Sequence, residues 1–492
     1  MKIREYIQVK AAGETPDPAV FCPINGYILN PVNPDDGWFL IAEFPNDSPN
    51  SATFDPRTLR ANGTLAWDLG DGTIILYQDS VSYTYSDSSP RVAALYGKGT
   101  CNLSTVEVQS DNLIGIIDLS HSAFSSAYGW YIVTNSGITG LILPSVITVN
   151  IYQFYVISTG FIGVLDLSVL QTFTDDADIA IYSNSAMTGV MFAASVTGKI
   201  RNLSIYSMGH VGILDLSMFD YMSAASMQIF SNPAMTGLLF KSVVTGTMTG
   251  ISIYSNSTLV GVLYLDMFSS FSAAASITIY SNPLMTGVVF ASSITGTFTS
   301  IQVRSLNITG TLDLSMFNSF GATTTISLYS NPTMTGVVFA SSIAGTIATM
   351  RIDSTGITGV LDISKFTAWT ATGTLYLNNN LSMTGVTFPS STITGFIRTL
   401  RIYSNTSLGY IDFTKLRTGV NSLNWDMQNN AWTAAIVNQI LVEIDGISVG
   451  GFTSRVINIG GTNADPDTTS GGYNGSAART SLIAKAFTVT IT

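Results

Sequence analysis

Short blocks of alternating apolar and polar residues recur along the chain from Val106 to about Asn430, once every 24 to 26 residues. In the clearest blocks, IAIYSNSAMTGVMF and ITIYSNPLMTGVVF, apolar residues fill the first and third places. Alternation with a period of two predicts a strand with one face in a core. Repetition at this period predicts a solenoid. The blocks begin at Val106, Trp130, Phe154, Ile179, Leu203, Met227, Ile251, Ile277, Ile301, Ile326, Met350, Leu375 and Leu400, with a less regular one near Ser422.

A polar residue follows each strand-like block, and a glycine usually comes a few residues later. Asparagine and glycine both favour bends, so we expect the chain to turn at these places. The arrangement resembles a leucine-rich repeat, whose LxLxxNxLxG core is matched across about two-thirds of the chain. The asparagines are Asn184, Asn232, Asn256, Asn282, Asn331, Asn380 and Asn405.

The blocks alternate between two versions, one continuing into LDLS or a close variant and the other into MTGVxF. The full repeat is therefore a pair of turns, about 49 residues long. The LDLS aspartates should lie about 10 Å apart, since parallel strands are spaced at about 4.8 Å. Because they form a uniform row, we interpret them as turn residues whose carboxylates accept hydrogen bonds from backbone N–H groups. We prefer this interpretation to a catalytic pair or a calcium site. They are Asp118, Asp166, Asp215, Asp313, Asp362 and Asp412.

The segment before the repeats contains WDLGDGT at Trp67 to Thr73 and VSYTY at Val81 to Tyr85. Asp71-Gly72 between strand-like sequences predicts a hairpin in a small all-β domain. The segment resembles the polycystic-kidney-disease (PKD) type of immunoglobulin-like sandwich, although Tyr83 stands where that family usually has histidine. The resemblance implies a spacer or adhesion module. The alternative is a β cap particular to this chain.

The end of the chain has a different pattern. The stretch from Ala431 to Asp445 places Ile436, Ile440 and Leu441 at helical spacing, and 476–484 is a second candidate helix before a final strand. The segment from INIGG to the terminus resembles terminal segments of tail and fibre-associated proteins of Bacteroidota phages. A solenoid also needs its last exposed core covered, so the segment is equally a candidate C-terminal cap.

Together these patterns predict a mostly β protein built around a leucine-rich-repeat-like solenoid of about 14 turns. We expect an N-terminal arm at 1–20, a PKD-like or immunoglobulin-like β-sandwich at 21–100, the solenoid at 101–430 and a small α/β capping domain at 431–492. At about 4.8 Å per turn, the solenoid should extend roughly 65 to 70 Å.

Composition narrows the possible functions. The formal net charge of −11 argues against a nucleic-acid partner, and the mean hydropathy of +0.35 is not concentrated in any run long enough to span a bilayer. Two cysteines exclude a thiolate zinc site. We expect His121 and His210 at the surface. The sequence therefore predicts no enzyme activity, catalytic residue, cofactor, metal or membrane insertion, and the first residues do not form a Sec signal.

Position four of the strand carries an aromatic residue in many turns, directed outward if positions one and three face the core. Stacked turns would place these rings about 4.8 Å apart. One interpretation is a ladder that stabilises the sheet, and the other is a binding strip for a sugar chain or partner surface. Arg304, Asp353 and Asn378 interrupt the row. The candidate ligand-binding residues are Tyr182, Tyr206, Phe230, Tyr254, Tyr280 and Tyr329.

The leading functional hypothesis is a virion-surface or tail-associated phage protein that adheres to a host glycan or protein receptor, or contacts other virion subunits through an end domain. A bacterial cell-surface adhesin is the first alternative, with an extracellular or cell-surface location. A structural filament or scaffold subunit is the second. A homo-oligomer is compatible with all three hypotheses.

Overall fold

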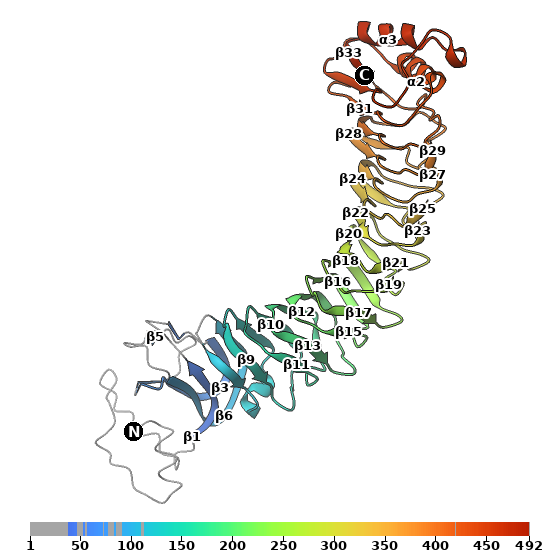
Figure 1. The fold of residues 1–492 in the computed structure, drawn as a ribbon. Helices are drawn as coiled ribbons and strands as arrows, with labels where there is room; N and C mark the ends of the chain where they lie inside the picture. Colours follow the sequence, from blue (N-terminus) through green and yellow to red (C-terminus); the bar gives the residue numbers. More distant parts are fainter. Residues whose placement is uncertain are drawn as a thin grey trace, which may run out of the picture. The chain divides into compact units, whose positions relative to one another are not determined.

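The computed structural model describes residues 38–46, 53–54, 57–71, 73–76, 83–84, 91–109, 113–418 and 420–491 of the 492-residue chain. The predicted arm at 1–20 lies outside these residues. Two compact units, 1–244 and 245–492, are described separately below. Stacked coils form a β-solenoid of about 13 turns, and two small helices lie near the C-terminus (Figure 1). The predicted class, a mostly β solenoid, is confirmed.

The N-terminal strands of unit 1 form an antiparallel sheet that continues into the solenoid. Strand β6 pairs in antiparallel fashion with β1 through its first residues and with β3 along most of its length, and it pairs in parallel with β8 through its last residues. The predicted boundary at residue 100 therefore lies inside one continuous strand. These strands are β1 (Trp38–Asn46), β2 (Thr53–Phe54), β3 (Arg57–Asp68), β4 (Ile74–Leu76), β5 (Tyr83–Thr84), β6 (Arg91–Gln109) and β8 (Gly129–Val133).

The hairpin predicted around Asp71 is confirmed, since β3 and β4 pair in antiparallel fashion on either side of it. The Asp68 carboxylate accepts a hydrogen bond from the backbone N–H of Gly70 at 2.9 Å, which closes the turn. The Tyr83 hydroxyl donates to the other side of the same turn, to Asp71 Oδ2 at 2.8 Å. Tyr83 thus holds the hairpin turn in place.

Each turn of unit 1 adds one strand to a parallel main sheet, and most turns add another to a second, two-stranded sheet. The predicted register is confirmed: Ile179 pairs with Leu203, and Leu203 pairs with Met227. The further main-sheet strands are β10 (Ile151–Ile157), β12 (Phe173–Asn184), β14 (Ile200–Met208) and β16 (Tyr221–Phe230). The second-sheet pairs are β7 (Ile114–Asp118) with β9 (Gly137–Ile142), β11 (Gly163–Leu167) with β13 (Met187–Phe192), and β15 (Gly212–Leu216) with β17 (Met235–Phe240). The 3-10 helix η3 spans Ser122–Ser126.

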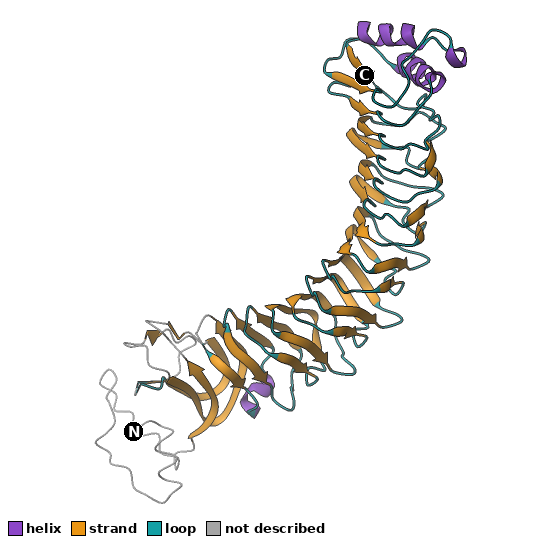
Figure 2. Cartoon of the chain, in the orientation of Figure 1, coloured by secondary structure: helices purple, strands orange, loops and turns teal. Residues whose placement is uncertain are grey.

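Unit 2 repeats this plan, with the main sheet and the second-sheet pairs on opposite sides of the turns (Figure 2). Its main-sheet strands are β18 (Thr245–Tyr254), β20 (Phe271–Asn282), β22 (Phe298–Leu306), β24 (Phe320–Ser327), β26 (Ile347–Arg351), β28 (Trp369–Tyr376), β30 (Ile397–Arg401) and β31 (Asn424–Asp426). Its second-sheet pairs are β19 (Gly261–Leu265) with β21 (Met285–Phe290), β23 (Gly310–Leu314) with β25 (Met334–Phe339), and β27 (Gly359–Asp362) with β29 (Met383–Thr387).

The bend after each main-sheet strand uses two residues with separate roles. The residue before the asparagine, Ser183 for example, adopts a left-handed conformation with φ of +58°. The asparagine is fully buried and joins neighbouring turns: Asn184 Oδ1 accepts from the backbone N–H of Thr159 at 2.8 Å, and its Nδ2 donates to the carbonyl of Val156 at 2.8 Å. The prediction that the chain bends here is confirmed, although the serine supplies the unusual backbone angle.

Other bends of the turns require glycine, for example the bend between β13 and β14. Gly198 has a φ of +100°, and an added Cβ would lie only 2.0 Å from the carbonyl oxygen of Phe173. Any side chain at that place would displace the neighbouring turn.

The C-terminal cap continues the main sheet and replaces second-sheet strands with helices. Its elements are α2 (Ala434–Ile447), β32 (Arg455–Asn458), the 3-10 helix η4 (Ser470–Gly472), α3 (Gly475–Ala484) and β33 (Phe487–Thr490). Strands β31, β32 and β33 pair in parallel. Helix α2 buries Val437, Ile440, Leu441 and Ile444, so the predicted apolar face is present, with Ile436 half-buried beside it. In the part of the chain that the structure describes, no helix has the length and hydrophobicity needed to span a membrane.

Candidate functional site

The predicted aromatic positions lie on the outward side of the main sheet. In strand β20, Ile277 and Ile279 are fully buried, whereas Tyr280 is half-buried. Tyr182, Tyr206, Phe230, Tyr254 and Tyr329 are also half-buried. The alternation of the strand therefore places all six predicted residues on one face of the sheet within their units.

In unit 1 the rings stack directly on one another. The centroids of Tyr182 and Tyr206 are 4.3 Å apart with an interplanar angle of 8°. Those of Tyr206 and Phe230 are 4.0 Å apart with an angle of 11°. Each inner ring face is therefore covered by the next ring, and the ring edges and hydroxyl groups face outward.

In unit 2 arginine joins the stack. The rings of Tyr254 and Tyr280 stack at 4.5 Å and 6°. The guanidinium of Arg304 then lies 3.9 Å from the centroid of Tyr280 and 5.3 Å from that of Tyr329. The expectation that Arg304 interrupts the row is wrong, because a planar guanidinium can stack on an aromatic face as a ring does.

The row continues with residues from position two of the strand, which the sequence interpretation missed. The Arg351 guanidinium lies 3.9 Å from the Tyr329 centroid and 5.3 Å from that of Tyr376. Arg401 lies 4.8 Å from the Tyr376 centroid. Asp353, one of the predicted interruptions, orients Arg351 by accepting from its Nε at 3.0 Å and its Nη2 at 3.1 Å. We call the stacked residues the ring strip: Tyr182, Tyr206 and Phe230 in unit 1, and Tyr254, Tyr280, Arg304, Tyr329, Arg351, Tyr376 and Arg401 in unit 2.

The geometry of the ring strip determines which contacts it offers. A sugar that stacks on an aromatic ring needs an exposed ring face, but the inner faces here are covered by neighbours. Hydroxyl groups and guanidinium N–H groups at the edge can still form hydrogen bonds. Burial raises the pKa of the Tyr254 hydroxyl, with a further contribution from Tyr280, so this hydroxyl stays protonated at neutral pH. The strip therefore offers a row of neutral and cationic hydrogen-bonding groups.

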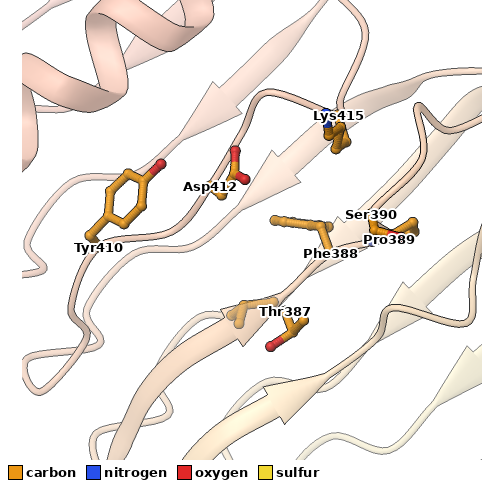
Figure 3. Close-up of a pocket in the computed structure, with 8 residues that line it drawn as sticks. Thr387, Phe388, Pro389, Ser390, Tyr410, Asp412 and Lys415 are labelled. Carbon is orange, nitrogen blue, oxygen red and sulfur yellow. The ribbon is translucent and has the colours of Figure 1, made fainter.

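A cleft of about 450 Å³ lies at the C-terminal end of the second-sheet side of unit 2 (Figure 3). Its lining includes Phe388, Tyr410, Asp412 and Lys415. Phe413 N and the Tyr410 hydroxyl both donate to the carboxylate of Glu443 in α2, which fixes the wall beside the cap. Burial raises the pKa of Tyr410, and the hydrogen bond to Glu443 raises it further. The cleft offers an apolar wall, an ammonium group and a carboxylate to a small polar ligand.

Sequence interpretation missed this cleft because its residues come from successive turns. The available signal was the variant block YIDF, in which Tyr410 replaces the usual aliphatic residue two places before the aspartate.

The LDLS aspartates act as turn residues, as predicted. In each, Oδ1 accepts from a backbone N–H two residues later at 2.8 or 2.9 Å; the residues are Asp118, Asp166, Asp215, Asp313, Asp362 and Asp412. Within the described ranges, no group of three or more histidine, cysteine or acidic side chains is placed to hold a metal ion.

The two histidines differ in their surroundings. His121 is half-buried and caps η3 by accepting from the backbone N–H of Ala123. His210 is only 4% exposed, so the expectation that it lies at the surface is wrong. It sits in the bend between β14 and β15, where strand periodicity gives no information on burial. Burial lowers the pKa of His210.

Comparisons of the chain with protein-family models, curated proteins and solved structures found no match. The resemblances to the PKD family and to phage tail proteins therefore rest on the sequence motifs alone.

Proposed function

We propose that this protein is a non-enzymatic virion-surface or tail-associated phage protein that uses its solenoid for adhesion. A β-solenoid is consistent with adhesion or structural roles. The assignment to a phage and to the virion surface is supported by the resemblance of the C-terminal segment. The proposed ligands are host glycans or a receptor protein, and an end domain contacts other virion subunits.

The observation that carries the adhesion proposal is the ring strip of unit 2. From Tyr254 to Arg401 it presents phenolic hydroxyls and guanidinium groups in one row, held in place by mutual stacking. Side chains that are fixed before binding lose less conformational entropy when a ligand arrives. Such a row suits a polyhydroxylated chain that runs along the solenoid. The LDLS carboxylates are engaged in their own turns, which supports a role in folding over a role in catalysis.

The test separates hydroxyl recognition from the stability of the stack. Wild type and the double variant Tyr280→Phe/Tyr329→Phe are compared for binding to a glycan array and to intact bacteria. Phenylalanine retains the ring and removes only the hydroxyl, so the fold is retained. The matched control is Tyr182→Phe/Tyr206→Phe in unit 1.

We expect the unit 2 variant to lose at least about tenfold in affinity, since each lost hydrogen bond weakens binding by roughly 1 kcal/mol, and the unit 1 variant to bind as wild type does. Unchanged binding by the unit 2 variant would mean that the strip stabilises the sheet and does not bind the ligand. The first alternative, a bacterial cell-surface adhesin, would use the same strip.

A structural filament or scaffold subunit is the second candidate function. It is favoured by a different observation, the exposed aliphatic residues on the second sheet, such as Ile213.

A further inference from the structure

The outward side of the second sheet in unit 1 exposes large aliphatic residues in a regular pattern. Ile116, Val164 and Ile213 are 57% to 64% exposed and recur at the same place in every second turn. Ile142, Met191 and Leu239 occupy the intervening turns and are 45% to 49% exposed. Large exposed apolar residues gathered on one face are a feature of interaction sites in proteins. We call these six residues the aliphatic face.

Strand register arranges the face in two columns. In the first, an aliphatic residue alternates with glycine: Val164 pairs with Gly189, and Ile213 pairs with Gly237. Ile116 pairs with Gly140 in the same way. In the first column a branched side chain, which protrudes from the sheet, therefore alternates with a glycine, which has no side chain. We call these the high and low positions of the column.

The second column alternates an aspartate with an aliphatic residue. Asp166 pairs with Met191, and Asp215 pairs with Leu239. Asp118 pairs with Ile142 at the start of the column. A second copy offset by one turn can face such a surface without placing carboxylates or branched side chains opposite each other.

We propose that a second copy of this chain covers the aliphatic face, with the two solenoids antiparallel. The two-fold axis lies in the plane of the face, along the strands, between the turns of Val164 and Gly189. This rotation exchanges high and low positions. Val164 then lies over the partner's Gly189, Ile213 over the partner's Gly140, and Ile116 over the partner's Gly237. A closed two-fold contact of this type uses the same patch on both subunits.

The same axis keeps the carboxylates of the two copies apart. Asp166 lies opposite the partner's Met191, and Asp215 lies opposite the partner's Ile142. Shifting one copy by a single turn would place aspartates opposite aspartates and branched side chains opposite each other. Like charges and steric conflict therefore disfavour alignments that are shifted by a single turn.

The second sheet of unit 2 has the same repeat, but its outward face is less suited to this contact. Thr311 occupies the high position between Val262 and Val360, and Tyr264 replaces an aspartate in the second column. The apolar column is thus interrupted, and for this reason we assign the contact to unit 1. Position 360 then provides a matched control, since Val360 is 60% exposed at the place equivalent to Ile213.

Sedimentation velocity of the full-length chain over a concentration series tests the proposal. We expect a reversible dimer, and we expect Ile213→Glu to weaken its association by at least about 100-fold, because each dimer would lose two aliphatic contacts over the partner's Gly140 and gain two carboxylates in their place. Val360→Glu should dimerise as wild type does. Both positions are exposed in the single chain, so both variants should fold, which circular dichroism would verify.

Charge substitutions at Met191 test the alignment. Met191 would face the partner's Asp166, so Met191→Glu should weaken the dimer while Met191→Lys should preserve it. Val338→Glu and Val338→Lys, at the equivalent place in unit 2, serve as controls. A monomer at all concentrations would overturn the proposal. Equal weakening by Met191→Glu and Met191→Lys, or equal effects of Ile213→Glu and Val360→Glu, would also overturn it. The strip's ligand plays no part in this test.

Discussion

The two sheets of each unit are built from the same repeat, yet their outward side chains differ in how far they are exposed to solvent. On the main sheet, Tyr280 is half-buried because Tyr254 and Arg304 cover its ring. On the second sheet, Ile213 is 64% exposed although it is as apolar as any core residue. The difference follows from the period of each pattern.

Main-sheet rings recur in successive turns, about 4.8 Å apart, so neighbours are in contact. The branched residues of the second sheet recur only in every second turn, about 10 Å apart, with a glycine between them. Apolar side chains pack only when their atoms approach within about 4 to 4.5 Å. When large outward side chains recur in every turn, neighbouring side chains therefore bury one another. When they recur only in every second turn, they stay exposed and are available for contact with another chain.

The largest expected effect comes from removing a buried asparagine that joins neighbouring turns of the main sheet. Asn331 Oδ1 accepts from Leu306 N at 3.0 Å, and its Nδ2 donates to Val303 O at 2.8 Å and Leu328 O at 2.9 Å. Asn331→Ala leaves these buried backbone groups unpaired, so we expect a loss of about 3 to 5 kcal/mol in unfolding free energy. Urea denaturation followed by circular dichroism measures it.

Asn307→Ala is the control for that experiment. Asn307 is exposed and accepts one side-chain hydrogen bond, from Thr333. Its loss should change stability by less than about 1 kcal/mol. Similar losses in both variants would mean that the buried asparagines do not hold the turns together.

The second prediction tests the comparison itself. Tyr280→Ala removes two stacking contacts, and we expect a loss of about 1 to 2.5 kcal/mol. Val360→Thr replaces an exposed branched residue by another of similar shape and should change stability by less than about 0.5 kcal/mol. Thermal unfolding of both variants measures the difference. Equal destabilisation would contradict the conclusion that only the main-sheet surface covers itself.

The sequence predicted the turns and their register because a buried period-two pattern permits only one alignment. It placed Tyr280 on the outward face for the same reason. It did not predict that Arg351, from position two, would reach Tyr329, because the direction of a long side chain depends on its neighbours and not on spacing. The burial of His210 and the cleft beside Tyr410 arise in bends and between turns, where strand periodicity carries no information.

A third prediction concerns pH and the bend that joins the two sheets at His210. Burial lowers the folded-state pKa of His210 from its usual 6.5. Below about pH 6.5 the unfolded chain therefore binds more protons than the folded one, and stability falls as the pH drops through the lowered pKa. His210→Met should reduce the difference between melting temperatures at about pH 7.5 and about pH 5. An unchanged difference would show that other groups determine the acid sensitivity.

The last prediction has the smallest expected effect. It tests whether the guanidinium of Arg304 takes the place of an aromatic ring in the strip. Arg304 lies 3.9 Å from the Tyr280 centroid and 5.3 Å from that of Tyr329. Arg304→Ala should cost about 0.5 to 1.5 kcal/mol because both contacts are lost. Arg304→Tyr should remain within about 0.5 kcal/mol of wild type, since a ring at this place meets the same neighbours at the same spacing. If Arg304→Tyr is as unstable as Arg304→Ala, the charge of Arg304 matters more than its planarity, and the strip of unit 2 differs in kind from the ring stack of unit 1.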